Sequence, residues 1–442
     1  MTTTLATARA ADLGSGRPVV DRAEGCWIYD TEGRDYLDAS SGTVCVNIGH
    51  GVPEVLAAMA DQARRVCFAH RNQFVNRPAV QLTEAVHEVT GHLFREVVYT
   101  NSGSEATEAA LRLLLNHHAL RGAADRTVVL AQFPSYHGMT AGALSISGHP
   151  PRQRNLTALH ASPVSVGAVR ARARDALVPD PADWEAAFAE VGSDRIAAVV
   201  VEPVGCAASG AAVIPDETLR GLRELCDRTG ALLVVDEVMT GFGRTGDWFA
   251  HSRSGARPDL VITGKGLGAG YAPIGACLVG RAVLPGRSAS DVAVGHTMSG
   301  NPLSAATALA VLRYVREHGL LDRARRTGEL LAAGLAELAA DWEFVGEPRG
   351  RGLIQGLPLV QDPAAFADGP LNLRLCEAAM RCGLQLYPAG VDARFQSVLV
   401  SPPLTLTEGE LDTLLARLDR AVRLVADELG ATRIGTARRS PR

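Results

Sequence analysis

The chain has 442 residues, of which 47% are hydrophobic, and it carries a net charge of −4. This length is enough for two or three domains with a large buried core. The small negative charge argues against a general surface for nucleic acid or membranes, and no stretch reaches the roughly 18 apolar residues of a membrane span. The eight cysteines are scattered and form no C-x-x-C pair. We therefore expect buried thiols in a reducing compartment, no metal site and a cytoplasmic protein.

In chain order, the predicted elements begin with a β-hairpin over residues 25–40 and continue with helices over 52–66 and 79–89. From about residue 96, short apolar strands alternate with helices, a pattern typical of a mostly parallel sheet covered on both faces. We expect strands over 96–100, 127–132, 197–202, 231–236, 260–263 and 276–279, and helices over 104–120, 181–191, 216–229, 303–318 and 322–340.

These elements predict an α/β fold with a large domain over residues 51–303. Residues 304–430 are expected to form a smaller α+β domain, against which the N-terminal segment 1–50 packs, and 431–442 are expected to be a flexible tail. Two short arginine-rich stretches, 170–174 and 323–326, are interrupted by alanine, so they do not indicate a nucleic-acid site. Ligands of parallel sheets bind at the carboxyl ends of the strands, where the polar motifs described next are expected to lie.

Lys265 is the single lysine among the 44 Lys and Arg residues, and it stands in the Gly-rich stretch 262–270. Arginine supplies surface charge as well as lysine does, but only lysine offers a primary amine that can lose its proton and attack a carbonyl. A genome that exchanges Lys for Arg explains the scarcity of lysine. It does not explain why the remaining lysine follows the apolar run 231–237, so the pattern favours a Schiff-base lysine.

The segment after the strand predicted at 96–100 could bind a phosphate. Gly103 allows a close approach of the backbone, and the hydroxyl groups of Ser102 and Ser104 stand at the start of the next helix. The first-turn amides of a helix attract anions. A plain capping box from Ser102 to Glu105 explains the same residues, and for this motif alone it is the simpler interpretation.

Asp236 ends an apolar strand, so its carboxylate needs a cationic or protonated partner. Arg244 could be that partner, and so could the protonated ring nitrogen of a bound heteroaromatic cofactor. Tyr136 follows another strand and could stack on a flat ring. The adjacent His137 could contact the same ligand or serve only in packing.

Two further motifs are weak when taken alone. Glu202 ends a strand and could orient a substrate or pair with an arginine, and the hydroxyl groups of residues 296–302 could reach a phosphate. Taken together, a phosphate-binding helix end, a stacking tyrosine, an acid for a ring nitrogen and a single amine are the parts that a pyridoxal phosphate (PLP) site needs. The sequence has no H-E-x-x-H motif, no G-x-S-x-G motif and no dinucleotide-binding fingerprint.

From about residue 25 to 430, the order of these motifs resembles the class III (ω-amino) aminotransferase family of fold type I PLP enzymes. The most specific string is Asp-Glu-Val-Met-Thr-Gly-Phe-Gly-Arg-Thr-Gly at 236–246, together with the lysine loop at 264–275. The other motifs that carry the resemblance are Asn101–Ala109, Tyr136–Gly138, Glu202–Pro203 and His296–Leu303.

The resemblance implies three catalytic residues. Lys265 would form the Schiff base with the cofactor, and Asp236 would bind its ring nitrogen. Tyr136 would stack on one face of the ring, and Val238 would pack on the other.

The resemblance also implies that Gly103 and Ser104 hold the cofactor phosphate. Thr297 of the partner subunit would help, which implies a homodimer with shared active sites, and Glu202 would lie near the substrate side. The complete set of cofactor-binding residues that we predict is Ser102, Gly103, Ser104, Tyr136, His137, Glu202, Asp236, Val238, Lys265 and Thr297.

Two stretches depart from the pattern of the family. After Glu202-Pro203, members often show Val-Gln-Gly, whereas this chain has Val-Gly-Cys at 204–206. Many members also place an arginine before a Pro-Pro strand to bind an acceptor carboxylate. Here Tyr387 is assigned to that place, and Arg394 from a longer loop is the alternative substrate-binding residue.

We therefore predict a PLP-dependent aminotransferase that moves an amino group from an amine or (ω-)amino acid donor to an oxo acid or other carbonyl acceptor by a ping-pong mechanism. A racemase, an aminomutase or a decarboxylating relative would use the same Lys265, Asp236 and Tyr136, because only the pocket decides which bond to the α carbon breaks. A noncatalytic binding or scaffold protein on the same fold is an alternative of another class, and the intact set of three residues argues against it.

Overall fold

The computed structural model describes residues 16–154, 167–172, 177–292, 294–362, 369–431 and 433–434. Its central feature is a seven-stranded sheet in the order β4-β12-β11-β10-β7-β5-β6. In this sheet β12 runs antiparallel to both of its neighbours, and the other pairs are parallel. The predicted mostly parallel sheet is confirmed. Its strands are β4 (Phe94–Thr100), β5 (Val128–Phe133), β6 (Gly167–Arg172), β7 (Ile196–Val201), β10 (Leu232–Asp236), β11 (Leu260–Thr263) and β12 (Gly275–Gly280).

The middle strands of this sheet are buried along their whole length, which explains why their sequences are apolar throughout. Alternate residues face opposite sides: Val200 and Val234 pack with α4 (Gly103–Ala119), while Val199 and Val235 pack with helices on the other face. Those helices are α3 (Arg77–Val89), α8 (Pro181–Val191), α9 (Asp216–Thr229) and α10 (Pro302–Glu317).

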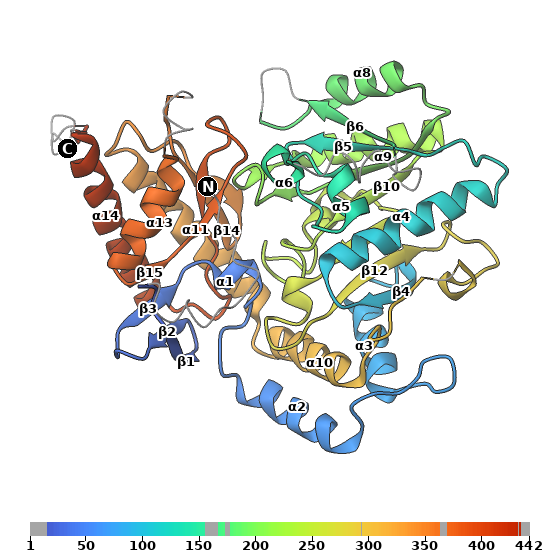
Figure 1. Cartoon of the computed structure of the whole chain (residues 1–442), viewed down its shortest axis with the longest axis horizontal. Coiled ribbons are helices and arrows are strands. Elements are labelled where there is room, and N and C mark those ends of the chain that lie inside the picture. The colour runs from blue at the N-terminus through green and yellow to red at the C-terminus, as the bar shows by residue number, and fades with distance from the viewer. Residues whose placement is uncertain are drawn as a thin grey trace.

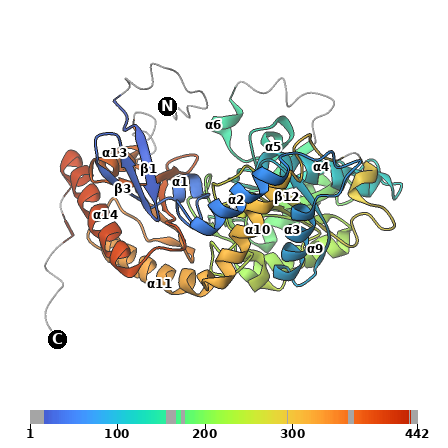
Figure 2. The same cartoon turned by 90° about the horizontal axis from the view of Figure 1, so that it is seen from below.

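The first and last parts of the chain lie side by side (Figures 1 and 2). The N-terminal hairpin strands join β15 in a sheet of order β1-β2-β3-β15, in which β15 runs parallel to β3. A further sheet, β13-β14-β17-β16, packs with the C-terminal helices. The strands are β1 (Val20–Glu24), β2 (Trp27–Asp30), β3 (Asp35–Asp38), β13 (Arg349–Arg351), β14 (Ile354–Pro358), β15 (Leu384–Gln385), β16 (Tyr387–Ala389) and β17 (Ser397–Val400), and the helices are α11 (Leu320–Ala339), α13 (Leu371–Arg381) and α14 (Glu408–Leu429).

Helix α10 belongs to both parts of the molecule. Leu309 and Leu312 pack in the core beside the large sheet, whereas Val311 and Val315 pack with the C-terminal elements. The remaining short elements are α1 (Ser41–Val44), α2 (Pro53–Arg65), α5 (Ala141–Ile146), α6 (Pro150–Gln153), β8 (Val204–Gly205), β9 (Ala212–Val213) and the 3-10 turns at Ala250–Ser254, Lys265–Leu267 and Ala289–Val292.

The helices and strands with predicted bounds are found within a few residues of those bounds, and one strand of the large sheet was missed. Strand β6 pairs in parallel with β5 at the edge of the large sheet and contains the first three residues of the arginine-rich stretch 170–174. Alternation of Arg with Ala hides the apolar pattern of this strand. Residues 173–174 and most of the predicted tail lie outside the described residues.

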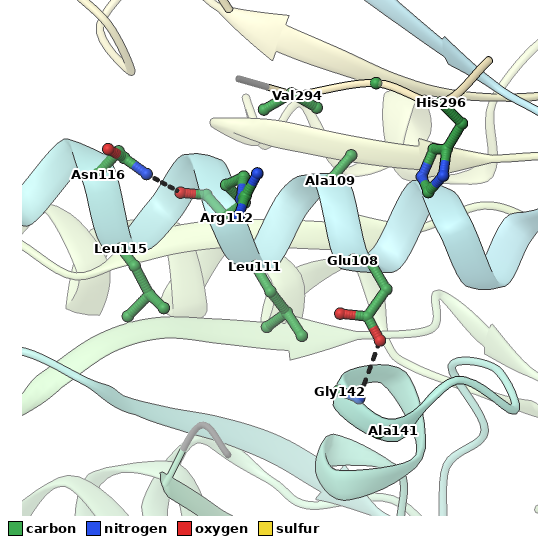
Figure 3. Close-up of a pocket in the computed structure, with 11 residues that line it drawn as sticks. Glu108, Ala109, Leu111, Arg112, Leu115, Asn116, Ala141, Gly142, Val294 and His296 are labelled. Carbon is green, nitrogen blue, oxygen red and sulfur yellow. Dashed lines mark hydrogen bonds between the residues drawn. The ribbon is translucent and has the colours of Figure 1, made fainter. Parts of the chain in front are cut away.

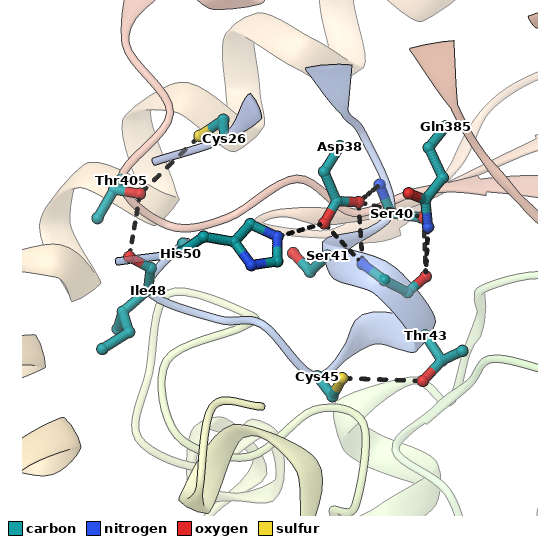
Figure 4. Close-up of polar contacts among 12 residues, drawn as sticks. Cys26, Asp38, Ser40, Ser41, Thr43, Cys45, Ile48, His50, Gln385 and Thr405 are labelled. Atoms are coloured by element: carbon teal, nitrogen blue, oxygen red, sulfur yellow. Dashed lines mark hydrogen bonds and ion pairs between the residues drawn. The ribbon is translucent and has the colours of Figure 1, made fainter. Parts of the chain in front are cut away.

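The turn that follows β3 is fixed by the buried Asp38 (Figure 4). Both carboxylate oxygens of Asp38 accept the Gly42 N–H, at 2.9 and 2.8 Å, and His50 Nε2 lies 3.5 Å from Oδ2. Gln385 Nε2 of β15 donates to the Gly42 carbonyl at 3.4 Å. This turn therefore ties the N-terminal segment to β15.

Candidate active site

The polar motifs gather at the carboxyl ends of the strands of the large sheet. Lys265 follows β11, Asp236 ends β10 and Glu202 follows β7. Tyr136 lies three residues after the end of β5. Strand β4 points the same way as β11, because both are antiparallel to β12, so the segment 102–104 reaches the same edge. The ends of parallel strands are where such sheets bind ligands.

The partner of Asp236 within the protein is His137. The Asp236 side chain is buried, its Oδ2 lies 2.8 Å from His137 Nδ1, and its Oδ1 accepts the Val238 N–H at 2.9 Å. The possible pairing of Asp236 with Arg244 is wrong. The histidine next to Tyr136 therefore orients this carboxylate.

Arg244 has a structural role. Its buried guanidinium donates to the carbonyls of Leu353, Ser401 and Pro402 and to the side chains of Ser41 and Asn47. Burial lowers the pKa of Arg244 to about 10. This cation joins the segment after α1 to the strand end at 401–402, behind the lysine loop.

Glu202 anchors two backbone segments. Its Oε1 accepts the Tyr136 N–H at 2.6 Å, and its Oε2 accepts the Cys206 N–H at 3.1 Å. Burial, reinforced by the negative charge of Asp236, raises the pKa of Glu202 to about 7. The carboxylate contacts no arginine in the described hydrogen bonds and ion pairs, and it fixes the position of Tyr136.

Lys265 begins a 3-10 turn directly after β11 and has a positive φ of 35°. Its side chain is partly buried, and desolvation lowers the pKa of its amine. The neighbouring glycines allow close contacts. A Cβ on Gly266 would lie 2.3 Å from Asn47 Nδ2, and one on Gly264 would lie 3.3 Å from the Gly103 nitrogen. The lysine loop thus packs against the start of α4.

The start of α4 is capped and remains suited to an anion. Ser102 Oγ accepts the Glu105 N–H at 3.2 Å, so the expected cap is present. Ser104 Oγ accepts the Met139 N–H at 3.1 Å. A Cβ on Gly103 would lie 2.9 Å from both Cγ atoms of Val238. Because first-turn amides have no acceptor within their own helix, they can bind a phosphate beside Val238 and the lysine loop.

The predicted substrate residues lie at different depths. Tyr387 is partly buried on β16 and is paired in register with the buried Leu399 of β17. Arg394 is exposed, with its guanidinium carbon 5.4 Å from the centre of the Phe395 ring. Strand β17, which precedes Pro402-Pro403, carries no cation.

The side chain of Thr297 is exposed to solvent. It lines an open cavity of about 550 Å³ together with Phe68, Asn101, His296 and Met298. Asn101 directly precedes the segment 102–104, so this cavity borders the start of α4.

Arg152 was not predicted from the sequence. Its guanidinium carbon lies 4.4 Å from the centre of the Tyr136 ring. It stands in the short helix α6, after two prolines, where no periodic pattern assigns a side chain to the site. His149, three residues earlier, packs edge-on against the same ring at 5.8 Å.

No helix of the described residues is long and apolar enough to cross a membrane. In the same part of the chain, no group of three His, Cys, Asp or Glu side chains could hold a metal ion.

The fold is that of the PLP-dependent transferases of fold type I, which the similar solved transaminase structures share. Over residues 12–422 the chain matches the family model described as "Aminotransferase class-III", and it belongs to that family. The resemblance found in the sequence is confirmed. Class III aminotransferases depend on PLP, and the glycine at 103, which lets α4 begin against Val238, fits such a cofactor.

Individual relatives resemble the whole chain. An uncharacterized aminotransferase of Bacillus subtilis, YodT, is 35% identical over 95% of this chain and 98% of its own length. Putrescine–pyruvate aminotransferase of Pseudomonas aeruginosa is 32% identical over 90% of this chain and 89% of its own. The crystal structure of a PLP-bound amine transaminase from an uncultivated Pseudomonas species has a TM-score of 0.85 and 30% identity, and the match covers 95% of this chain and 98% of that one. The protein is thus an aminotransferase.

Proposed function

We propose that Lys265, Asp236 and Tyr136 form the catalytic centre of this aminotransferase. One observation carries the proposal. Lys265, the buried Asp236 with its partner His137, and the start of α4 all lie at the same edge of the large sheet. Ser102, Gly103 and Ser104 would hold the phosphate of PLP. Val238 and Tyr136 would pack on opposite faces of its ring, with His137 and Glu202 fixing the surrounding side chains.

When bound, PLP supplies an aldehyde that links reversibly to amines and a ring that accepts electron density from the reacting carbon. The carboxylate of Asp236, oriented by His137, would accept a hydrogen bond from the ring nitrogen and keep that nitrogen protonated. Burial lowers the pKa of Lys265, so more of its amine is neutral near pH 7 and can act as a base. Nζ of Lys265 would take the α proton of the substrate and hold it for return.

We propose an amine or (ω-)amino acid as donor and an oxo acid or other carbonyl compound as acceptor, in a ping-pong reaction. The relative named for putrescine and pyruvate, 32% identical, supports this pair of classes. The apolar surroundings of Tyr387, which packs with Val204, Cys206 and Leu399, suit a carbon chain in the substrate pocket.

We further propose a homodimer in which Thr297 reaches the site of the partner subunit. Phe74 and Val75, between α2 and α3, are 63% and 85% exposed, and Phe68 and Met298 line the cavity at Thr297. Apolar groups of this kind on a surface indicate a partner.

A second cavity, of about 530 Å³, lies along α4 on the other side of Gly295 and His296. In Figure 3, Glu108 reaches the Gly142 N–H beneath it, and Val294 and His296 close the opposite side. A second copy of the chain would cover both cavities.

The domain division and the compartment are also proposals. The large domain would span residues 51–303 and the small domain 304–430, with 1–50 packed on it, which the pairing of β3 with β15 supports. All eight cysteines are free thiols, which supports the cytoplasm.

Replacement of Lys265 tests the catalytic assignment. Lys265→Ala, purified with added PLP, should lose the visible absorption band and about three orders of magnitude in turnover or more. Lys265→Arg is the matched control, because it restores the positive charge without a reactive amine and should be equally inactive. Near-normal turnover by Lys265→Ala would refute the assignment.

The type of reaction needs a separate experiment. A donor added to the wild-type enzyme without an acceptor should bleach the visible band, because a transaminase keeps the amino group until an acceptor arrives. A racemase would leave the band unchanged.

A further inference from the structure

Arg152 is a partly buried cation without a carboxylate partner among the described residues. Its guanidinium donates to a weak acceptor, Met139 Sδ, at 3.8 Å from Nη1, and it also contacts the phenols of Tyr136 and Tyr387. Its carbon lies 4.4 Å from the centre of the Tyr136 ring. All three acceptors are neutral, so the positive charge of the guanidinium has no anion beside it among the described residues.

Other arginines of this chain that are buried or partly buried donate mainly to backbone carbonyls of the protein itself. Arg126 donates to three backbone carbonyls, and Arg349 donates to those of Ser209 and Gly210. Arg244 is surrounded in the same way. Because a desolvated charge is costly without such partners, the surroundings of Arg152 suit an acceptor that comes from a ligand.

The position of Arg152 is on the substrate side of the proposed site. Burial raises the pKa of both Tyr136 and Tyr387, and the charge of Arg152 opposes this rise in each, which places the guanidinium near both phenols. Tyr136 is held by Glu202, and Tyr387 packs with the cluster that contains Cys206. Both tyrosines therefore connect Arg152 to the groups around Lys265.

Between His149 and Arg152, which both pack against the Tyr136 ring, Arg152 is the one that carries a positive charge at pH 7. Burial, and then the charge of Arg152, lower the pKa of His149 to about 4, so His149 is neutral at pH 7. Strand β17 places Leu399 opposite Tyr387, and Arg394 is exposed. An arginine on that strand, which the family pattern predicts, is absent from the described structure.

We propose that Arg152 binds the carboxylate of the oxo-acid or amino-acid substrate through its guanidinium, beside Tyr136 and Tyr387. This inference rests on the proposed active site at Lys265. It makes Arg152 a specificity residue: substrates with a carboxylate gain a charge-assisted, two-pronged hydrogen bond that simple aldehydes and amines cannot make.

The test compares acceptors with and without a carboxylate. With a series of aliphatic amines that lack a carboxylate as donors, kcat/KM is measured for pyruvate, 2-oxoglutarate and propanal. In Arg152→Gln, the ratio of the better oxo acid to propanal should fall about 10- to 100-fold, mainly through a higher KM, because hydrogen bonds to charged groups contribute about 1.5–3 kcal/mol. Arg152→Lys keeps the charge but not the fork and should lie in between.

Arg154→Gln is the matched control, since Arg154 is exposed two residues away and should leave the ratio unchanged. A second measurement is calorimetric binding of propionate, an unreactive carboxylate, to the PLP-loaded enzyme, which should weaken in Arg152→Gln. Three results would each overturn the proposal. The first is an equal loss of kcat/KM for the oxo acids and for propanal in both Arg152 variants, and the second is unchanged binding of propionate. The third is a wild-type enzyme that aminates propanal but neither oxo acid. Failure of the active-site proposal has a different signature, because then the wild type shows neither the visible band nor turnover of any acceptor.

Discussion

His137 Nδ1 lies 2.8 Å from Asp236 Oδ2, which joins the loop after β5 to the end of β10. Glu202 holds the backbone of the adjacent Tyr136 from a third strand. Three neighbouring strands thus position one tyrosine and one carboxylate through hydrogen bonds that are buried from water.

Removal of the histidine should weaken this arrangement. His137→Ala should lower kcat by about 10- to 100-fold, because a hydrogen bond to a charged group contributes about 1.5–3 kcal/mol. His137→Asn retains a side-chain N–H donor and should lose less. The measurement is steady-state turnover at saturating PLP, and wild-type kcat in His137→Ala would show that Asp236 needs no such partner.

Gly103 should tolerate no side chain. A Cβ there would lie 2.9 Å from both Cγ atoms of Val238, so Gly103→Ala should cost about 1–3 kcal/mol of stability or weaken PLP binding correspondingly. Gly221→Ala, in helix α9 where a Cβ meets nothing within 4 Å, should be neutral or stabilising.

The double variant Gly103→Ala/Val238→Ala should recover part of this loss, because the two side chains are in contact. The free energy of unfolding in urea and the affinity for PLP are measured for the wild type, Gly103→Ala, Gly221→Ala and the double variant. Identical losses in the single and double variants would contradict the proposed clash.

Acid should destabilise the fold through His117. Burial lowers the pKa of His117 to about 4, and its Nδ1 lies 2.7 Å from the Val283 carbonyl. Unfolded histidine titrates near 6.5. Because the folded pKa is the lower one, the contribution of His117 to stability is complete above pH 6.5 and is lost as the pH falls toward 4.

Between pH 7 and 5, the free energy of unfolding should therefore fall by about 1–2 kcal/mol from this residue. His117→Asn should be less stable at pH 7 but show a correspondingly weaker fall, as measured by urea denaturation at both pH values. His92→Asn, at an exposed turn with a φ of 56° that Asn tolerates, is the control for the loss of one histidine. An unchanged pH dependence in His117→Asn would contradict this prediction.

The proposed dimer should depend on the segment between α2 and α3. Phe74→Asp places a charge on an apolar surface and should shift the chain toward monomers, measured by sedimentation, with weaker PLP retention if Thr297 serves the partner's site. Val20→Asp is the matched control, because Val20 is similarly exposed, at 61% against 63%, but lies in β1. Monomeric wild-type protein, or equal effects of both substitutions, would count against this interface.

The large sheet could be predicted because its strands are apolar throughout and bounded by clear helices, as in Ile196–Val201. Strand β6 was missed because its alternating arginines resemble a polar surface. The pairing of β15 with β3 could not be predicted, because two-residue strands far apart in the sequence carry no periodic signal.

For the site, Lys265, Asp236 and Tyr136 were predicted from residue type and from their place at strand ends. The partner of Asp236 was left open between Arg244 and a cofactor nitrogen, and the contact with His137 was not predicted, because the sequence does not show that the loop after β5 meets the end of β10. Arg152 was missed because its contact with Tyr136 depends on the path of the loop after α5.

The parallel pairing of β3 with β15 also bears on the order of events during biosynthesis. Strand β3 is translated long before Leu384 and Gln385, so its outer edge stays unpaired until these two residues have been made. Such a long loop closure is slow compared with local folding. The sheet around Asp236, whose strands are closer together in the sequence, should therefore form before β3 pairs with β15.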